Sequence, residues 1–79
     1  MAERSYEPRL WRLKEAGANP ATQAAVRRLI YKRYGQYIDQ GMFSKAFRGE
    51  LPTGRGEEIR KMADAILTEA EKEAGVTAC

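Results

Sequence analysis

Apolar residues along this chain recur three and four positions apart, which is the spacing of amphipathic helices. No segment alternates apolar and polar residues as a half-exposed strand does. The helical pattern is interrupted by four glycines, which end helices because they tolerate positive φ: Gly17, Gly35, Gly49 and Gly75. The pattern predicts an all-α fold, a compact bundle of four to five helices.

The first expected helix covers residues 6 to 16, with Ser5 as its N-cap and Leu10 and Leu13 facing inward. The second is opened by Pro20, with Thr22 as a cap, and ends near Gly35. Its inward stripe is expected to contain Val26, Leu29, Ile30, Arg33 and Tyr34.

The third expected helix covers residues 39 to 48, with Asp39 as its N-cap. Phe43, Ala46 and Phe47 are predicted to face inward. Residues 51 to 56 contain two glycines and a proline and are predicted to form a loop. The fourth helix, residues 57 to 74, has one continuous apolar stripe, formed by Ile59, Met62, Ala63, Ile66, Leu67, Ala70 and Ala74.

The 79 residues are enough for one domain, placed at residues 1–75, with residues 76–79 as a frayed tail. A chain this short hides only about 60% of the surface of its unfolded form, so a partner is expected to supplement the core. With no histidine and one cysteine, Cys79, the chain has no means to build a zinc site, a disulfide framework or a histidine-based acid/base pair. We therefore expect no enzyme, no metal and no cofactor. The absence of a leader pattern and of a long apolar run predicts a cytoplasmic protein without a membrane span.

Charge is unevenly distributed, although the net charge is only +3. Residues 21 to 50 carry six basic and two acidic side chains, a balance of +4. Residues 57 to 79 carry three basic and six acidic side chains, a balance of −3. Ordinary solvated helix faces account for either segment alone, whereas their segregation favours a polyanionic partner for the centre of the chain.

The stretch from Ile38 to Gly49, IDQGMFSKAFRG, resembles the recognition helix of phage-repressor, Cro-type and LacI-type helix-turn-helix proteins. Leu10–Gly17 and Thr22–Leu29 are similar to the first two helices of those domains, and Leu51–Ile66 to the loop and helix that follow. The resemblance covers residues 6 to 70. It implies a lambda-repressor-like fold, and a sequence-specific transcriptional regulator, a small phage- or plasmid-type repressor, that binds double-stranded DNA as a homodimer.

The resemblance also implies which side chains contact DNA. Gln40 is expected to bond to adenine in the major groove, and Lys45 or Arg48 to guanine or phosphate. Ser44, together with Thr22 and Gln23, is expected on phosphate. The remaining basic residues of the set add attraction that is independent of sequence: Arg27, Arg28, Lys32, Arg33 and Arg55.

One feature departs from the family pattern. Thr22 and Ile38 are 16 positions apart, about a turn and a half of helix more than a tight helix-turn-helix uses. Either the second helix is extended and docks the third at the usual angle, or the two helices cross differently.

A second hypothesis is a helical module that binds another protein through a ridge of Tyr31, Tyr34 and Tyr37 and through the acidic fourth helix. This ridge is expected to pack on the first helix or on a partner, which we favour over stacking on single-stranded nucleic acid. RNA binding is a weaker third hypothesis. Trp11 is expected in the core or in a dimer interface, and Gly54-Arg55-Gly56, which lacks the rest of a P-loop signature, in a flexible loop.

Overall fold

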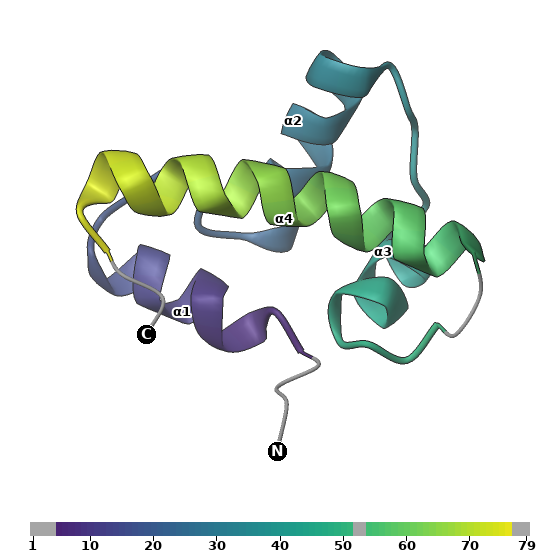
Figure 1. Cartoon of the computed structure of the whole chain (residues 1–79), viewed down its shortest axis with the longest axis horizontal. Helices are drawn as coiled ribbons and strands as arrows, with labels where there is room; N and C mark the ends of the chain where they lie inside the picture. The colour runs from purple at the N-terminus through teal and green to yellow at the C-terminus, as the bar shows by residue number, and fades with distance from the viewer. Residues whose placement is uncertain (1–4, 52–53, 77–79) are drawn as a thin grey trace.

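The computed structural model describes residues 5–51 and 54–76. These residues form four helices and no strand: α1 (Glu7–Glu15), α2 (Gln23–Tyr34), α3 (Gln40–Phe47) and α4 (Gly54–Ala74) (Figure 1). The predicted all-α class and the four helices are confirmed. None of the helices in this part of the chain is long and apolar enough to cross a membrane. Of the predicted frayed tail, residues 76–79, all but Val76 lie outside the described residues.

The long helix α4 forms the spine of the molecule, and α1, α2 and α3 each pack against it (Figure 1). By contrast, α2 and α3 make little contact with each other. The predicted stripe of α4 is buried or packed against the core along its whole length. The core is completed by residues from the other segments: Leu13, Val26, Ile30, Ile38, Phe43, Ala46 and Phe47.

Side-chain caps fix where α2 and α3 begin. The Thr22 hydroxyl accepts a hydrogen bond from the backbone N–H of Ala25 at 3.1 Å. The Asp39 carboxylate accepts from the N–H groups of Gly41 and Met42 at 3.0 and 3.3 Å. Because a cap satisfies N–H groups that have no partner inside the helix, these residues set the helix starts. The predicted caps of α2 and α3 are confirmed, whereas the prediction of Ser5 as the N-cap of α1 is wrong, because Tyr6 holds that position and its side chain makes no capping hydrogen bond.

The predicted inward stripe of α2 is only partly correct. Val26 and Ile30 are fully buried, but Leu29 and Tyr34 are 37% and 41% exposed, and the Arg33 side chain is 42% exposed. The C-terminal end of α2 projects past α4 (Figure 1), which leaves Tyr34, the last residue of the helix, little surface to cover.

The prediction that Pro20 opens α2 is wrong. Pro20 is buried and lies before the helix, which starts at Gln23. The capping side chain of Thr22 sets this start.

The prediction of a loop at residues 54 to 56 is also wrong, because α4 already begins at Gly54. Gly56 is buried, and a Cβ atom there would collide with the backbone carbonyl of Leu51. The glycine therefore serves close approach of the preceding segment to the helix, and not flexibility.

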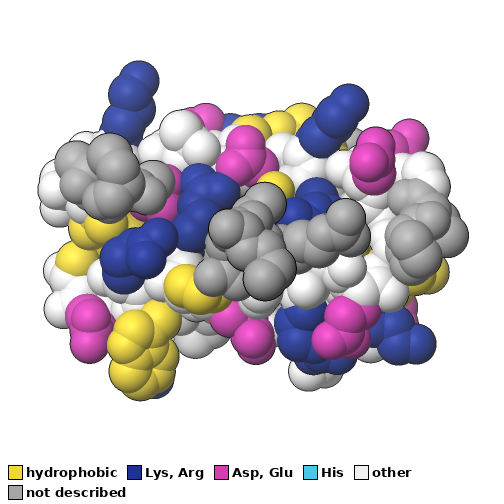
Figure 2. Space-filling view, turned by 60° about the horizontal axis from the view of Figure 1, so that its bottom comes forward, with side chains coloured by type: hydrophobic (Ala, Val, Ile, Leu, Met, Phe, Trp, Pro, Cys, Tyr) yellow, Lys and Arg dark blue, Asp and Glu magenta, His cyan; other side chains and the backbone are white. Residues whose placement is uncertain are grey.

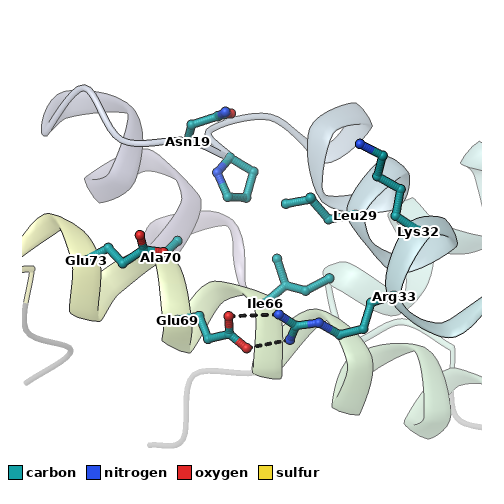
Figure 3. Close-up of a pocket in the computed structure, with 9 residues that line it drawn as sticks. Asn19, Leu29, Lys32, Arg33, Ile66, Glu69, Ala70 and Glu73 are labelled. Atoms are coloured by element: carbon teal, nitrogen blue, oxygen red, sulfur yellow. Dashed lines mark hydrogen bonds and ion pairs between the residues drawn. The ribbon is translucent and has the colours of Figure 1, made fainter.

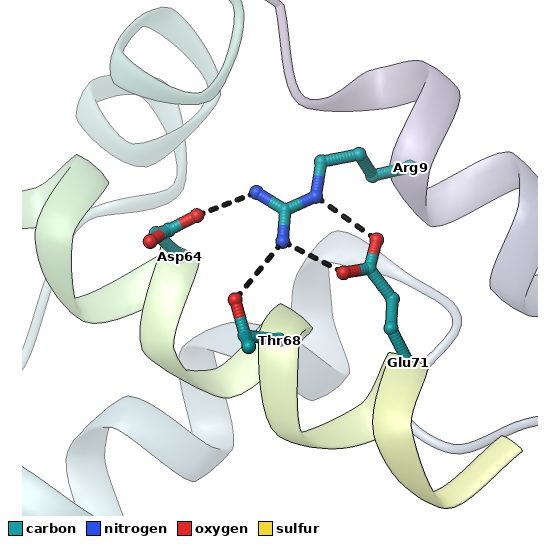
Figure 4. Close-up of polar contacts among 4 residues, drawn as sticks. All are labelled: Arg9, Asp64, Thr68 and Glu71. Atoms are coloured by element: carbon teal, nitrogen blue, oxygen red, sulfur yellow. Dashed lines mark hydrogen bonds and ion pairs between the residues drawn. The ribbon is translucent and has the colours of Figure 1, made fainter. Parts of the chain in front are cut away.

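A polar clamp joins α1 to α4 (Figure 4). The Arg9 guanidinium donates to both carboxylate oxygens of Glu71 at 3.0 and 2.9 Å, to Asp64 at 2.6 Å and to the Thr68 hydroxyl at 3.2 Å. Glu71 is 5% exposed, and its hydrogen bonds raise the pKa of Arg9. A buried carboxylate needs such a partner, so the clamp fixes α1 on the spine.

The side of the molecule that carries α1 has surface charges of both signs (Figure 2). Figure 2 brings this side forward and shows basic and acidic side chains interspersed on it. Trp11 is 59% exposed, so the core is the wrong one of its two predicted places, and the dimer interface stays a prediction. The Lys14 ammonium lies 5.6 Å from the centre of the Trp11 ring, which is within cation–π range.

Candidate nucleic-acid interface

Helix α3 has one buried side and one exposed side, as its sequence predicts. Phe43 and Phe47 stack with ring centres 5.3 Å apart, and Tyr6 meets Phe47 edge-on at 5.7 Å. The exposed residues of α3 are Gln40, Gly41, Met42 and Lys45, with Gln40 at the start of the helix and Lys45 on the side away from Phe43 and Phe47. Lys45 makes no ion pair with any described residue. The first turn of α3 therefore presents an amide, and its second turn an ammonium, to solvent.

Ser44 and Arg48 are less available than their sequence positions indicate. The Arg48 guanidinium donates to the Ser44 hydroxyl at 2.6 Å and to both Glu50 carboxylate oxygens at 3.2 and 3.1 Å. Glu50 raises the pKa of Arg48, and Arg48 in turn lowers the pKa of Glu50. The two side chains predicted to contact DNA are thus bonded to other groups of the chain. Arg48 reaches a phosphate only if it breaks its ion pair with Glu50.

Arg27 and Arg55 hold the segment that joins α2 to α3, residues 35–39, which we call the connector. Arg27 donates from its Nη1 atom to the carbonyl of Ile38 at 3.2 Å. Its Nε atom is buried and has no hydrogen-bond partner in the described part of the chain. Arg55, in the first turn of α4, donates to the Gln36 side-chain oxygen at 3.2 Å. These two arginines brace the connector from both sides.

A hollow of about 200 Å³ lies between α2 and the connector. We call it the basic hollow. It is lined by Ala24, Arg27, Arg28, Tyr31, Gln36, Tyr37 and Ile38, none of which is acidic. Arg28 is exposed and makes no ion pair with the described residues. Ile38 directly precedes the cap of α3, so the hollow adjoins the end of α3 that carries Gln40.

The three tyrosines do not form the predicted ridge against the first helix. Tyr31, Tyr34 and Tyr37 are 58%, 41% and 74% exposed, so none of them is buried against α1. Helix α2 ends at Tyr34, which places Tyr37 in the connector. Tyr31 and Tyr37 both line the basic hollow, whereas Tyr34 does not.

The structure brings together only part of the predicted DNA-contacting set. Arg27 and Arg28 line the basic hollow, whose lining ends at Ile38, two residues before Gln40, and Arg55 reaches the connector from α4. Thr22 is committed to capping α2, and Gln23 lies with Trp11 in a shallow depression next to α1. No sequence pattern pointed to Gln36, because its role depends on how the connector folds back along α2.

The path between α2 and α3 is more open than a tight helix-turn-helix. The family pattern has a turn of about three or four residues, whereas the connector runs over residues 35–39 and the two helices make little contact. Among the described residues, no group of three or more acidic or cysteine side chains is placed to hold a metal ion. Comparisons of the chain with protein-family models, with curated proteins and with solved structures find no match.

Proposed function

We propose that this protein binds double-stranded DNA and acts as a small transcriptional regulator in the cytoplasm, with α3 in the major groove. The observation that carries the proposal is the basic hollow, which has two arginines and no carboxylate in its lining and ends at Ile38, two residues before the exposed Gln40 of α3. Phosphate contacts position a protein on the duplex, and base-edge contacts specify the sequence. The hollow supplies the first kind of group and Gln40 the second.

The proposed contacts follow from what each side chain is free to do. Gln40 is exposed and offers the amide that pairs with the N6 and N7 edge of adenine. Lys45, which is also exposed and lies one turn further along α3, reaches a guanine or a phosphate. Arg28 neutralises a backbone phosphate, because it has no carboxylate partner among the described residues. Ser44 and Arg48 contribute only after Arg48 exchanges Glu50 for DNA.

The regulatory role is supported by the resemblance of residues 38 to 49 to the recognition helices of phage repressors. Repressors of that kind bind as homodimers, with half-sites about 34 Å apart, one helical turn of DNA. A homodimer of this small chain would double its phosphate contacts and supplement its thin core.

The test is a salt titration of duplex affinity, with DNA from upstream of the protein's own gene. We expect log Kd to change linearly with log salt, and Arg28→Ala to weaken binding to all sequences and to reduce the slope by about one. Gln40→Ala should cost about 1–3 kcal/mol on the preferred site and little on random DNA.

Arg12→Ala provides the matched control. Arg12 is also an exposed arginine without an ion pair in the described part of the chain, but it lies on α1. An equal loss from Arg12→Ala and Arg28→Ala would contradict a DNA site at the basic hollow. Absence of duplex binding at low salt would contradict the function itself.

The second candidate function, protein binding through the tyrosines, is favoured by the exposure of Tyr31 and Tyr37. Its acidic element is weaker than the sequence predicted, because four of the six carboxylates in residues 57–79 pair with arginines of this chain: Glu58, Asp64, Glu69 and Glu71. The double change Tyr31→Ala and Tyr37→Ala should then abolish capture of a protein partner while helix content, measured by circular dichroism, stays unchanged.

A further inference from the structure

A second hollow lies on another side of α2, between that helix and the C-terminal half of α4 (Figure 3). We call it the α2–α4 groove. Its volume is about 440 Å³. It is lined by Asn19, Pro20, Leu29, Lys32, Arg33, Ile66, Glu69, Ala70 and Glu73.

The lining of the groove is apolar in the middle and charged on both sides. Pro20, Ile66 and Ala70 are buried, whereas Leu29, at the groove, leaves 37% of its surface exposed. When a partner covers a large aliphatic side chain that is exposed next to a buried apolar surface, the loss of apolar contact with water stabilises the complex.

The two walls carry opposite charges. Helix α2 contributes Lys32 and Arg33, and α4 contributes Glu69 and Glu73. Arg33 and Glu69 already pair within the chain, at 2.5 and 2.8 Å. Lys32 and Glu73 make no ion pair with any described residue, and Figure 3 places them on opposite sides of the groove. One cation and one anion therefore remain for a partner.

We propose that the α2–α4 groove is the interface between two copies of this chain, related by a two-fold axis, with each Lys32 paired to the partner's Glu73. In a two-fold interface the same patch meets itself, so a patch with one basic and one acidic wall is complementary to its own copy. The axis creates the pair twice and places the two Leu29 side chains in the same buried patch. The homodimer rests on the proposed function, but the interface is tested without DNA and stands or falls separately.

Charge reversal is the first test, measured by sedimentation equilibrium in reducing buffer so that Cys79 forms no cross-link. Lys32→Glu places two carboxylates together at each contact, and Glu73→Lys places two ammonium groups together. Each change should weaken the dimer by about tenfold, because two modest ion pairs become two repulsions. The wild-type chain should be a dimer.

Mixing the two single variants is the decisive test. In a mixed dimer, the glutamate of Lys32→Glu meets the lysine of Glu73→Lys, and the wild-type Lys32 of one chain meets the wild-type Glu73 of the other. Both contacts are again attractive, so the mixture should form 1:1 dimers with affinity near that of the wild type. An ion pair formed within one chain gives no such recovery, since mixing leaves every chain with its own repulsion.

The controls are Lys61→Glu and Glu57→Lys, which change net charge equally at exposed positions of α4 outside the groove. Both should dimerise as the wild type does. The proposal is overturned if the wild-type chain is monomeric at every concentration, if the mixture stays monomeric, or if the control variants lose the dimer to the same extent. If the wild-type chain dimerises but does not bind duplex DNA, the proposed function fails and the interface stands.

Discussion

Helix α2 contributes two neighbouring cations to each of two hollows, and the wall opposite differs between them. In the α2–α4 groove, Arg33 meets a carboxylate of α4, and the groove contains two carboxylates in all. In the basic hollow, Arg27 meets only a backbone carbonyl of the connector, and Arg28 meets no carboxylate of the described residues. The roles of Arg27, Arg28 and Arg33 are thus decided by the element that each arginine faces.

The comparison separates charges used for folding from charges available for binding. An arginine with a carboxylate partner has its charge balanced inside the molecule and contributes little to the surrounding potential. One without such a partner attracts anions from solution, above all a polyanion. Arg9 is the extreme example of the first kind, since its guanidinium contacts two carboxylates and one of them is buried.

Removing Arg9 is the strongest way to sharpen this difference. Arg9→Met keeps the apolar stem but leaves Glu71 buried without its cation, and we expect it to lower the free energy of unfolding by about 3 kcal/mol. Arg28→Met, in the basic hollow, should leave stability unchanged within about 0.5 kcal/mol. Urea denaturation at neutral pH measures both values.

A second substitution distinguishes a lost charge pair from lost packing. Adding Glu71→Leu to Arg9→Met removes the stranded carboxylate, and stability should return to within about 1 kcal/mol of the wild type. If the double variant is no more stable than Arg9→Met alone, the clamp acts through packing and the division between the two kinds of arginine fails.

The start of α4 tests how the wall of the basic hollow is held. Gly56 lies beside Arg55, which bonds to Gln36 of the connector, and its Cα faces the Leu51 backbone. Gly56→Ala should destabilise the protein by roughly 2 kcal/mol, because the obstructing group is backbone and has little freedom to move. Gly54→Ala is the matched control. Its added Cβ would meet nothing within 4 Å, so thermal unfolding should show no loss of stability.

Arg27 is the one cation of the basic hollow with a structural bond. Arg27→Met removes the hydrogen bond to the Ile38 carbonyl, and we expect a loss of about 1 kcal/mol. Amide exchange of the connector should speed up while exchange in α4 does not. If Arg27→Met leaves connector exchange unchanged, the arginine does not brace this segment, and both cations of the hollow are then available to an anion.

The sequence predicted what local spacing and capping determine. The four helices, the caps at Thr22 and Asp39 and the buried stripes of α3 and α4 follow from neighbours three or four residues apart. It did not predict the Arg9 clamp, because Arg9 and Glu71 are 62 positions apart and no local pattern links them. It also misassigned Gly56, since a glycine that permits close backbone approach looks in a sequence like a glycine that forms a loop.

The candidate site was less predictable than the fold, for a similar reason. Arg48 and Ser44 are four residues apart, a spacing at which side chains on a helix meet, and Arg48 donates a hydrogen bond to Ser44. The prediction that both side chains contact DNA did not consider this bond. The lining of the basic hollow depends on the path of the connector, which no periodicity describes. A residue such as Gln36 becomes part of a site only once that path is known.

The smallest expected effect concerns the Arg33–Glu69 pair of the α2–α4 groove, which is open to solvent. Arg33 lowers the pKa of Glu69 from its ordinary value of 4.5, so the folded chain binds fewer protons than the unfolded chain just below that pH. The pair's contribution is complete above this value and is lost as the pH falls through the lowered pKa. Glu69→Gln should therefore be slightly less stable than the wild type at neutral pH, and equally stable in acid, where Glu69 is protonated in both states. A Glu69→Gln curve that parallels the wild type would show that Arg33 is as free as Arg28, and would remove the contrast between the two sides of α2.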